Sequence, residues 1–165
     1  MHVKLVAATP GGTGEIGALP DVPARDPARK KGAGRWSGQC PAKGVRFDLR
    51  YGNVEVARHH GKIVATLMLT TNKTRAIDRA DLTKAARPRY LVNAAAAPGA
   101  RRCGTGRACL QQAADVAWRA SADIICLDAF DHPAGAGEFY RKCRYHAVDR
   151  VTDRKARLIS FEVLA

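Results

Sequence analysis

The sequence predicts an α/β fold, and three local patterns indicate it. Residues 52–58 and 62–69 are two runs of strand-forming residues on either side of a His-His-Gly turn, which is typical of a β-hairpin. Between residues 90 and 119, an apolar strand, a turn with two glycines and an amphipathic helix follow one another. Residues 157–163 alternate apolar and polar side chains, as a final antiparallel strand does.

Composition limits the class of protein. The chain has 165 residues, of which 46% are hydrophobic, enough for one domain over residues 1–165 with a sizeable core. The five cysteines contain no C-x-x-C pair, so neither a disulfide framework nor a zinc knuckle is indicated. His59 and His60 are adjacent in the predicted turn, where side chains seldom converge on one ion, so we expect no metal. With no signal peptide and no apolar run long enough to cross a bilayer, we expect a cytoplasmic protein without a membrane partner.

The most informative stretch lies between the strand that starts at Tyr90 and the following helix. Pro98 and Gly99 end the strand, and two later glycines let the backbone approach a ligand. The first N–H groups of a helix lack partners inside the helix, so they can bind an anion, and three arginines supply the countercharge. The predicted phosphate cradle consists of Arg101, Arg102, Cys103, Gly104, Thr105, Gly106 and Arg107.

The spacing excludes two common nucleotide-binding loops. A Walker loop would place Lys and then Ser or Thr after its last glycine, but Thr105 and Gly106 follow Gly104. A dinucleotide fingerprint would require a small residue where Cys109 stands, together with an upstream βαβ unit. A plain turn or helix cap is the alternative to a ligand site. Cys103 stands where a thiolate is favoured, yet reduced, unreactive thiols are the preferred interpretation of all five cysteines.

The pattern Arg101-x-x-Gly104-x-Gly106 resembles the acyl-CoA signature of the GNAT family of N-acetyltransferases. Residues 122–128, a short apolar run, are similar to the fifth strand of that family. Tyr140, beside a predicted short helix, takes the place of the tyrosine in the second family signature. The resemblance covers roughly residues 50–165, and residues 30–41 are similar to a helix end in one bacterial subgroup.

The resemblance implies a mixed, mostly antiparallel sheet of six or seven strands with helices on both faces. The fourth and fifth strands would splay apart to admit the acyl-pantetheine arm, with residues 91–95 and 124–128 as the walls. Acetyl-CoA is the implied cosubstrate, with no metal, and the acetyl group would pass directly to a primary amine bound at the same time. Backbone N–H groups of Asn93, Ala94 and Ala95 would hold the pantetheine and polarise the carbonyl.

The resemblance also implies three candidate catalytic residues. Tyr140 would protonate the leaving thiolate. A phenol with a pKa of about 10 can still donate a proton to a thiolate whose conjugate thiol has a pKa of about 8.5. A core aromatic residue is the alternative for Tyr140. Asp128 and Glu55 are the candidate general bases for the amine. The alternatives are a cap of the next turn for Asp128 and a solvent-facing side chain for Glu55.

The chain departs from the family pattern in two places. Arg144-Tyr145 replaces the usual Gly-Phe, which removes the residue best able to take a left-handed turn after the helix. Residues 10–44 are rich in glycine and proline where the family places its first two helices, so we expect those helices to be short, broken or partly absent. Residues 149–155 are predicted to form a polar turn, which in the family borders the acceptor site.

The net charge of +13 must attract polyanions. The phosphates of CoA would use part of it, and the surplus in residues 23–43 and 149–157 indicates either plain solvation or an anionic partner such as RNA. Two alternative functions therefore stay open, a basic nucleic-acid-binding module and a non-catalytic acyl-CoA-binding relative. A homodimer is expected by analogy alone, and the sequence does not identify the amine acceptor.

Overall fold

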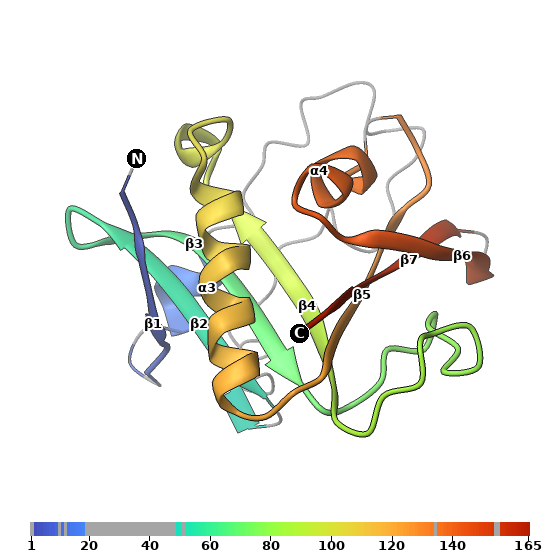
Figure 1. Ribbon diagram of the computed structural model, residues 1–165. Helices are drawn as coiled ribbons and strands as arrows, with labels where there is room; N and C mark the ends of the chain where they lie inside the picture. Colours follow the sequence, from blue (N-terminus) through green and yellow to red (C-terminus); the bar gives the residue numbers. More distant parts are fainter. Residues whose placement is uncertain are drawn as a thin grey trace. The chain divides into compact units, whose positions relative to one another are not determined.

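The computed structural model describes residues 2–9, 11, 13–18, 49–50, 52–133, 135–153 and 156–165. These residues contain both strands and helices, as expected for an α/β fold (Figure 1). The elements are β1 (Lys4–Ala7), α1 (Thr13–Ala18), β2 (Asn53–His59), β3 (Lys62–Thr70), β4 (Pro88–Ala96), the 3-10 helix η4 (Pro98–Ala100), α3 (Thr105–Arg119), β5 (Ile124–Phe130), α4 (Gly137–Lys142), β6 (His146–Asp153) and β7 (Ala156–Leu164).

The strands form a seven-stranded sheet in the order β1-β2-β3-β4-β5-β7-β6. The pair β4 and β5 is parallel, whereas β1 with β2, β5 with β7 and β6 with β7 are antiparallel. The prediction of a mixed, mostly antiparallel sheet of six or seven strands is therefore confirmed. Parallel pairing joins Pro88, Arg89 and Tyr90 of β4 to the first three residues of β5, and both strands continue beyond these pairs.

The chain divides into two compact units, which are described separately below. The first unit contains Met1–Met68 and Asn93–Ala113, and the second contains Leu69–Val92 and Ala114–Ala165. Strands β3 and β4 and helix α3 contribute residues to both units.

The first unit contains the predicted hairpin. His60 and Gly61 form its turn with φ angles of 48° and 79°, the two left-handed residues that a two-residue turn between twisted strands requires. Helix α3 reaches the edge strand β1 through Gln112. Its side-chain oxygen accepts a hydrogen bond from the Leu5 N–H at 2.8 Å, and its side-chain nitrogen donates to the Val3 carbonyl at 3.0 Å.

The second unit has its own buried core. Ile77, Tyr90, Ile124 and Cys126 pack together there, and Leu82 and Ala85 cover them. Ile77 and its two covering residues come from the 71–87 segment between β3 and β4, so this long connection is part of the packed structure.

The prediction of a polar turn over residues 149–155 is wrong for residues 149–153. Strand β6 continues through these residues, and its pairing with β7 reaches as far as Asp153 opposite Ala156. Polar residues dominate here because β6 is an edge strand and only part of its surface is buried. Polarity alone therefore predicted a turn where the chain is extended.

Most of the glycine- and proline-rich segment, including the helix end expected near residues 31–37, lies outside the described residues. Within it the structure describes α1, a helix of six residues. The expectation of short, broken or partly absent helices over residues 10–44 therefore stays a prediction.

Candidate functional site

The predicted cradle belongs to the first unit, where β4 gives way to α3 (Figure 1). Strand β4 ends at Ala96, a 3-10 turn follows, and the backbone takes left-handed conformations at Arg102 and Gly104, with φ angles of 59° and 80°. An added Cβ at Gly104 would meet no atom within 4 Å. Glycine is favoured there by backbone conformation, since space for a side chain is available.

The N-terminus of helix α3, the positive end of the helix dipole, has no acidic side chain in its first turn. The Gly104 carbonyl accepts the first helical hydrogen bond, from the Ala108 N–H at 3.0 Å. The N–H groups of Thr105, Gly106 and Arg107 therefore precede the first intrahelical donor. An anion at this position would gain from both the N–H groups and the helix dipole.

Thr105 provides an independent sign of a ligand. Its side chain is fully buried, and Thr105 Oγ1 has no hydrogen-bond partner among the described residues. A buried hydroxyl without a partner is costly, and a phosphate oxygen at the helix start could supply the missing acceptor. The cradle therefore fits an anionic group such as the pyrophosphate of CoA.

Neighbouring groups fix the remainder of the cradle. Arg101 Nε donates to the Ala96 carbonyl at 3.1 Å, and the exposed Cys103 thiol donates to the Arg101 carbonyl at 3.3 Å. Just upstream, Asn93 has a left-handed φ of 53° within β4. This residue departs from regular β conformation just before Ala94 and Ala95, which together with Asn93 are predicted to hold the pantetheine.

Glu55 lies in β2 of the first unit and is only 8% exposed. The interpretation of a solvent-facing side chain is therefore wrong. Burial raises the pKa of its carboxyl group above the ordinary value. The strand around it is buried at Val54, Val56 and Ala57 as well, which is why simple alternation did not reveal the orientation of Glu55.

Tyr140 lies in α4 of the second unit and is 8% exposed. Its ring packs against those of Phe161 and Tyr145, with centroids 5.7 and 5.9 Å away. Burial, followed by the negative charge of Asp128 and by Cys143, raises the pKa of the Tyr140 phenol to about 12. Tyr140 is thus packed in the core and also interacts electrostatically with a candidate base.

The departure at Arg144-Tyr145 preserves the backbone conformation that the usual glycine would give. Arg144 itself has a left-handed φ of 69°. The Tyr145 N–H donates to the Tyr140 carbonyl at 3.1 Å, and the Arg144 N–H donates to the Arg141 carbonyl at 2.9 Å. These two bonds form a Schellman motif, with arginine in the position that glycine usually occupies. Tyr145 is buried in place of the family phenylalanine.

Asp128 lies within β5, two residues before its end, and does not cap a turn. Its Oδ2 accepts a hydrogen bond from the Thr74 hydroxyl at 2.8 Å. Burial raises the pKa of Asp128, the hydrogen bond from Thr74 lowers it, and the nearby Asp153 raises it further. The net shift is upward, in the direction that suits a general base near neutral pH.

The 71–87 segment makes contacts with Asp128 and its neighbours that no motif in the sequence predicts. Besides the Thr74 bond, Arg75 pairs with Asp153 at 2.9 Å, and Thr83 donates to Glu162 through its N–H at 2.9 Å and its hydroxyl at 2.5 Å. A connection this long is uncommon unless it is functional, and its length was the signal available in the sequence.

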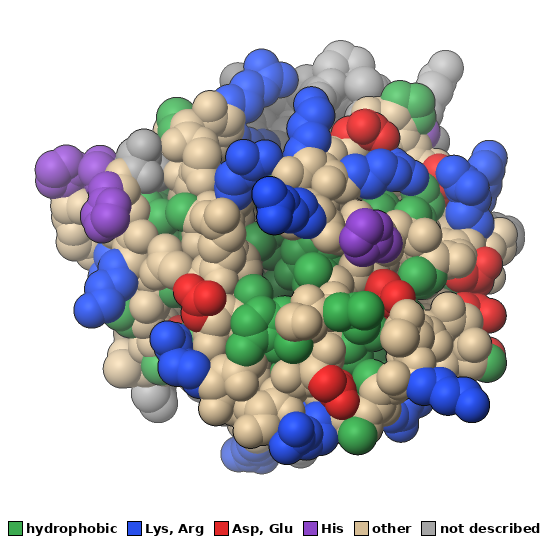
Figure 2. Space-filling model, viewed as in Figure 1, with side chains coloured by type: hydrophobic (Ala, Val, Ile, Leu, Met, Phe, Trp, Pro, Cys, Tyr) green, Lys and Arg blue, Asp and Glu red, His purple; other side chains and the backbone are tan. Residues whose placement is uncertain are grey.

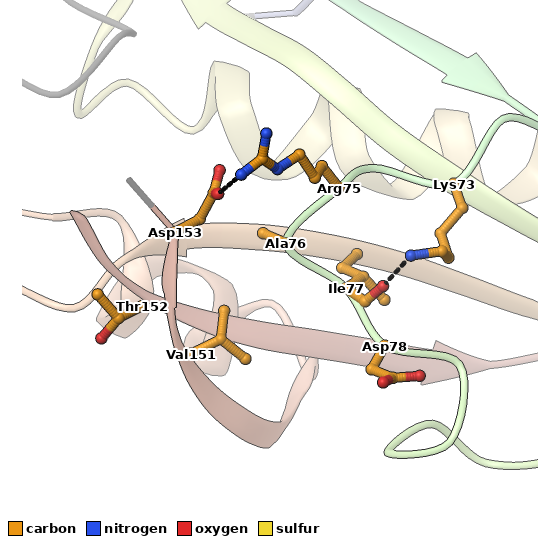
Figure 3. Close-up of a pocket in the computed structure, with 8 residues that line it drawn as sticks. All are labelled: Lys73, Arg75, Ala76, Ile77, Asp78, Val151, Thr152 and Asp153. Atoms are coloured by element: carbon orange, nitrogen blue, oxygen red, sulfur yellow. Dashed lines mark hydrogen bonds and ion pairs between the residues drawn. The ribbon is translucent and has the colours of Figure 1, made fainter. Parts of the chain in front are cut away.

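This segment and β6 line an open pocket of about 300 Å³ within the second unit (Figure 3). Its two basic side chains are already bonded, Arg75 to Asp153 and Lys73 to the Ile77 carbonyl. The lining residues are Lys73, Arg75, Ala76, Ile77, Asp78, Val151, Thr152 and Asp153.

Basic side chains of the described residues lie close together across the upper part of the face in Figure 2 and singly elsewhere. Asp and Glu side chains lie among them. Among the described residues, no group of three His, Cys, Asp or Glu side chains is arranged to hold a metal ion. No described helix is both long and apolar enough to span a membrane.

Comparison with known proteins shows the family and the fold of this chain. The model of the acetyltransferase (GNAT) family matches residues 25–145. A search of curated proteins found no significant match. Among solved structures, the ribosomal-protein-alanine N-acetyltransferase from Brucella melitensis has a TM-score of 0.72 at 14% identity, covering 98% of this chain and 99% of that one.

Two further structures show the same fold. A chimera built on the spermidine N-acetyltransferase from Vibrio cholerae has a TM-score of 0.71 at 14% identity, covering 99% of this chain and 96% of that one. The yncA protein from Salmonella typhimurium, solved with acetyl-CoA, has a TM-score of 0.71 at 12% identity, covering 99% of this chain and 94% of that one.

Proposed function

Because this chain belongs to the GNAT family of acetyltransferases, whose cosubstrate is acetyl-CoA, we propose that it transfers an acetyl group to a primary amine by direct attack while both substrates are bound. The observation that carries the proposal is the cradle at the start of α3. There, Thr105 Oγ1 has no partner among the described residues and no acidic side chain occupies the first turn.

The cradle residues divide between two parts of the cosubstrate. The N–H groups of Thr105, Gly106 and Arg107 bind phosphate oxygens, the basic side chains of the 101–107 stretch supply countercharge, and Thr105 Oγ1 donates to the same group. The backbone of Asn93, Ala94 and Ala95 holds the pantetheine and polarises the acyl carbonyl.

In the proposed reaction, acetyl-CoA supplies an activated thioester. Asp128 accepts the proton that the attacking amine loses as the C–N bond forms, and its raised pKa suits this role. Tyr140 donates the proton that the leaving sulfur takes up as the C–S bond breaks. Glu55, whose pKa is also raised, is the alternative base. Asp128 is preferred because it already interacts electrostatically with Tyr140.

The raised pKa of Tyr140 is compatible with this role. With its pKa raised to about 12, the phenol is fully protonated at neutral pH. Transfer of its proton to a thiolate with a conjugate pKa of about 8.5 is uphill by about 3.5 units, or about 5 kcal/mol. A total activation barrier of about 16 kcal/mol corresponds to a turnover of about 10 per second. The cost of this proton transfer is well below that barrier, so it does not prevent turnover at such a rate.

The acceptor class is proposed as a primary amine, in line with two proteins of the same fold. Their names give a ribosomal-protein alanine and spermidine as acceptors. A second candidate function, binding of an anionic polymer such as RNA, rests on the net charge of +13 alone. A non-catalytic acyl-CoA binder is less favoured, because Arg144 preserves the helix-end conformation beside Tyr140.

The test is calorimetric titration of acetyl-CoA into nucleic-acid-free protein at two salt concentrations. Gly104→Glu is expected to abolish binding, because it places a negative charge in the cradle and a side chain at a left-handed φ. Gly61→Glu is the matched control, since Gly61 has nearly the same φ and equally open space but lies in the hairpin turn. Equal acetyl-CoA affinity in both folded variants would remove the basis of the proposal. Binding by the wild type leads to thiol-release assays with a panel of amines.

A further inference from the structure

Three polar side chains form a row across β5, β7 and β6 in the second unit. The register places Asp128 opposite Ser160, and Ser160 opposite Asp149 on the other side. Residues directly opposite one another in antiparallel strands project from the same face of a sheet. Ser160 therefore lies between two carboxylates on one face.

Ser160 is the unusual member of this row. It is 2% exposed, and Ser160 Oγ has no hydrogen-bond partner within the described part of the chain. Buried hydroxyl groups nearly always have a partner, so an unpaired one between two aspartates indicates that a polar ligand completes it.

The carboxylates near the row repel one another. Desolvation raises the pKa of Asp81, on the 71–87 segment, and the charges of Asp149 and Asp78 raise it further. Asp153 similarly raises the pKa of Asp128. A bound cation would relieve this repulsion, and an ammonium group could also donate to Ser160 Oγ.

The pocket of about 300 Å³ is lined by the next residues of β6 and by the 71–87 segment, and its lining includes no member of the row. Val151 and Asp153 line it, and they project from the same face of β6 as Asp149 because strand residues alternate in steps of two. Figure 3 shows Asp78 on the loop and Asp153 at the end of β6 on opposite sides of this space. The pocket therefore begins two residues beyond Asp149 along β6, and it carries two carboxylates together with the basic side chains of Lys73 and Arg75.

We infer that this face binds a small aliphatic diamine as the amine acceptor, with one amine at Asp128 and the other, as an ammonium, between Asp149 and Ser160. The assignment rests on the proposed function for the role of Asp128 alone. Strands β5 and β6 are two strand spacings apart, about 9.5 Å. Charge-assisted bonds of about 2.8 Å at each end leave about 4 Å or somewhat more between the two nitrogens, the span of a short diamine.

The test is calorimetric titration of 1,3-diaminopropane, whose shorter chain matches this span, into the CoA-bound protein, with 1-aminopropane as the monoamine comparison. Asp149→Asn is expected to weaken diamine binding about tenfold, because a charge-assisted bond is lost, and to leave monoamine binding unchanged. Asp115→Asn, on the exposed side of α3, makes the same charge change away from the row and is expected to have no effect.

Ser160→Ala gives a second, opposite signature. Removing an unpaired buried hydroxyl is expected to raise the melting temperature of the ligand-free protein while weakening diamine binding.

Equal affinity for diamine and monoamine, or equal effects of Asp149→Asn and Asp115→Asn, would overturn the inference. If acetyl-CoA binds and the diamine does not, the inference fails and the proposed transferase function stands; if acetyl-CoA does not bind, the proposed function fails.

Discussion

Arg144→Gly is predicted to stabilise the protein, although it removes a side chain and adds none. Arg144 has a left-handed φ of 69° at the end of α4, where a residue with a Cβ is strained by about 1–2 kcal/mol. Glycine removes that strain but gives the unfolded chain more freedom, which offsets about 0.4–1 kcal/mol. The expected net gain is about 0.5–1 kcal/mol. With about 2.1 cal/mol/K of unfolding entropy per residue, that corresponds to a rise of about 1.5–3 °C in melting temperature.

The assay is chemical and thermal unfolding of the wild type, Arg144→Gly and Arg144→Ala. The alanine variant removes the same side chain and keeps the strained Cβ, so it is expected to show no gain. Equal stability of the glycine and alanine variants would refute the argument from backbone conformation. Because the two hydrogen bonds of the Schellman motif remain available, the glycine variant should also keep Tyr140 in place and retain the wild-type turnover.

Three further predictions concern the proposed reaction. Tyr140→Phe is expected to lower turnover in the thiol-release assay while acetyl-CoA affinity stays unchanged in titration; an unaltered turnover would assign Tyr140 to packing alone. Thr74→Val removes the hydrogen bond that lowers the pKa of Asp128, so the acidic limb of the kcat/KM profile should move to higher pH, and an unmoved limb with Asp128 still required would contradict the assignment. The raised pKa of Glu55 makes the folded state bind more protons than the unfolded state above the ordinary glutamate pKa, so stability falls as pH rises through that range. Glu55→Gln should flatten this dependence in denaturant unfolding between pH 4 and pH 7, and an unchanged slope would count against burial as the cause.

The local features of the fold were predictable because local rules govern them. A two-residue turn at His60 and Gly61 needs left-handed residues, and the sequence places glycine in the second position. Pro98 has no N–H to continue strand pairing and follows the end of β4, and a glycine at residue 104 before an amphipathic helix indicates a helix start. The cradle and the helix that contains Tyr140 both follow from such short-range signals.

The remainder depends on contacts between distant parts of the chain. The Thr74 hydroxyl donates a hydrogen bond to Asp128, which is 54 residues away in the sequence. The residue pattern of the 71–87 segment does not predict this contact. The burial of Glu55 is set by what packs around β2 and not by its neighbours in sequence. Arg144 takes a conformation that residue preference alone assigns to glycine, because the surrounding hydrogen bonds and the burial of Tyr145 determine the backbone there.

The side chain of Gln112 has a consequence for self-association. Strand β1 is an edge of the sheet, and an edge strand with unpaired N–H and C=O groups is a template for another chain. Gln112 occupies the Leu5 N–H and the Val3 carbonyl, so its amide acts as a substitute for a neighbouring strand. Val6, an exposed apolar residue on the same strand, would otherwise favour edge-to-edge pairing of two molecules. One glutamine on α3 thereby protects this edge of the sheet against aggregation.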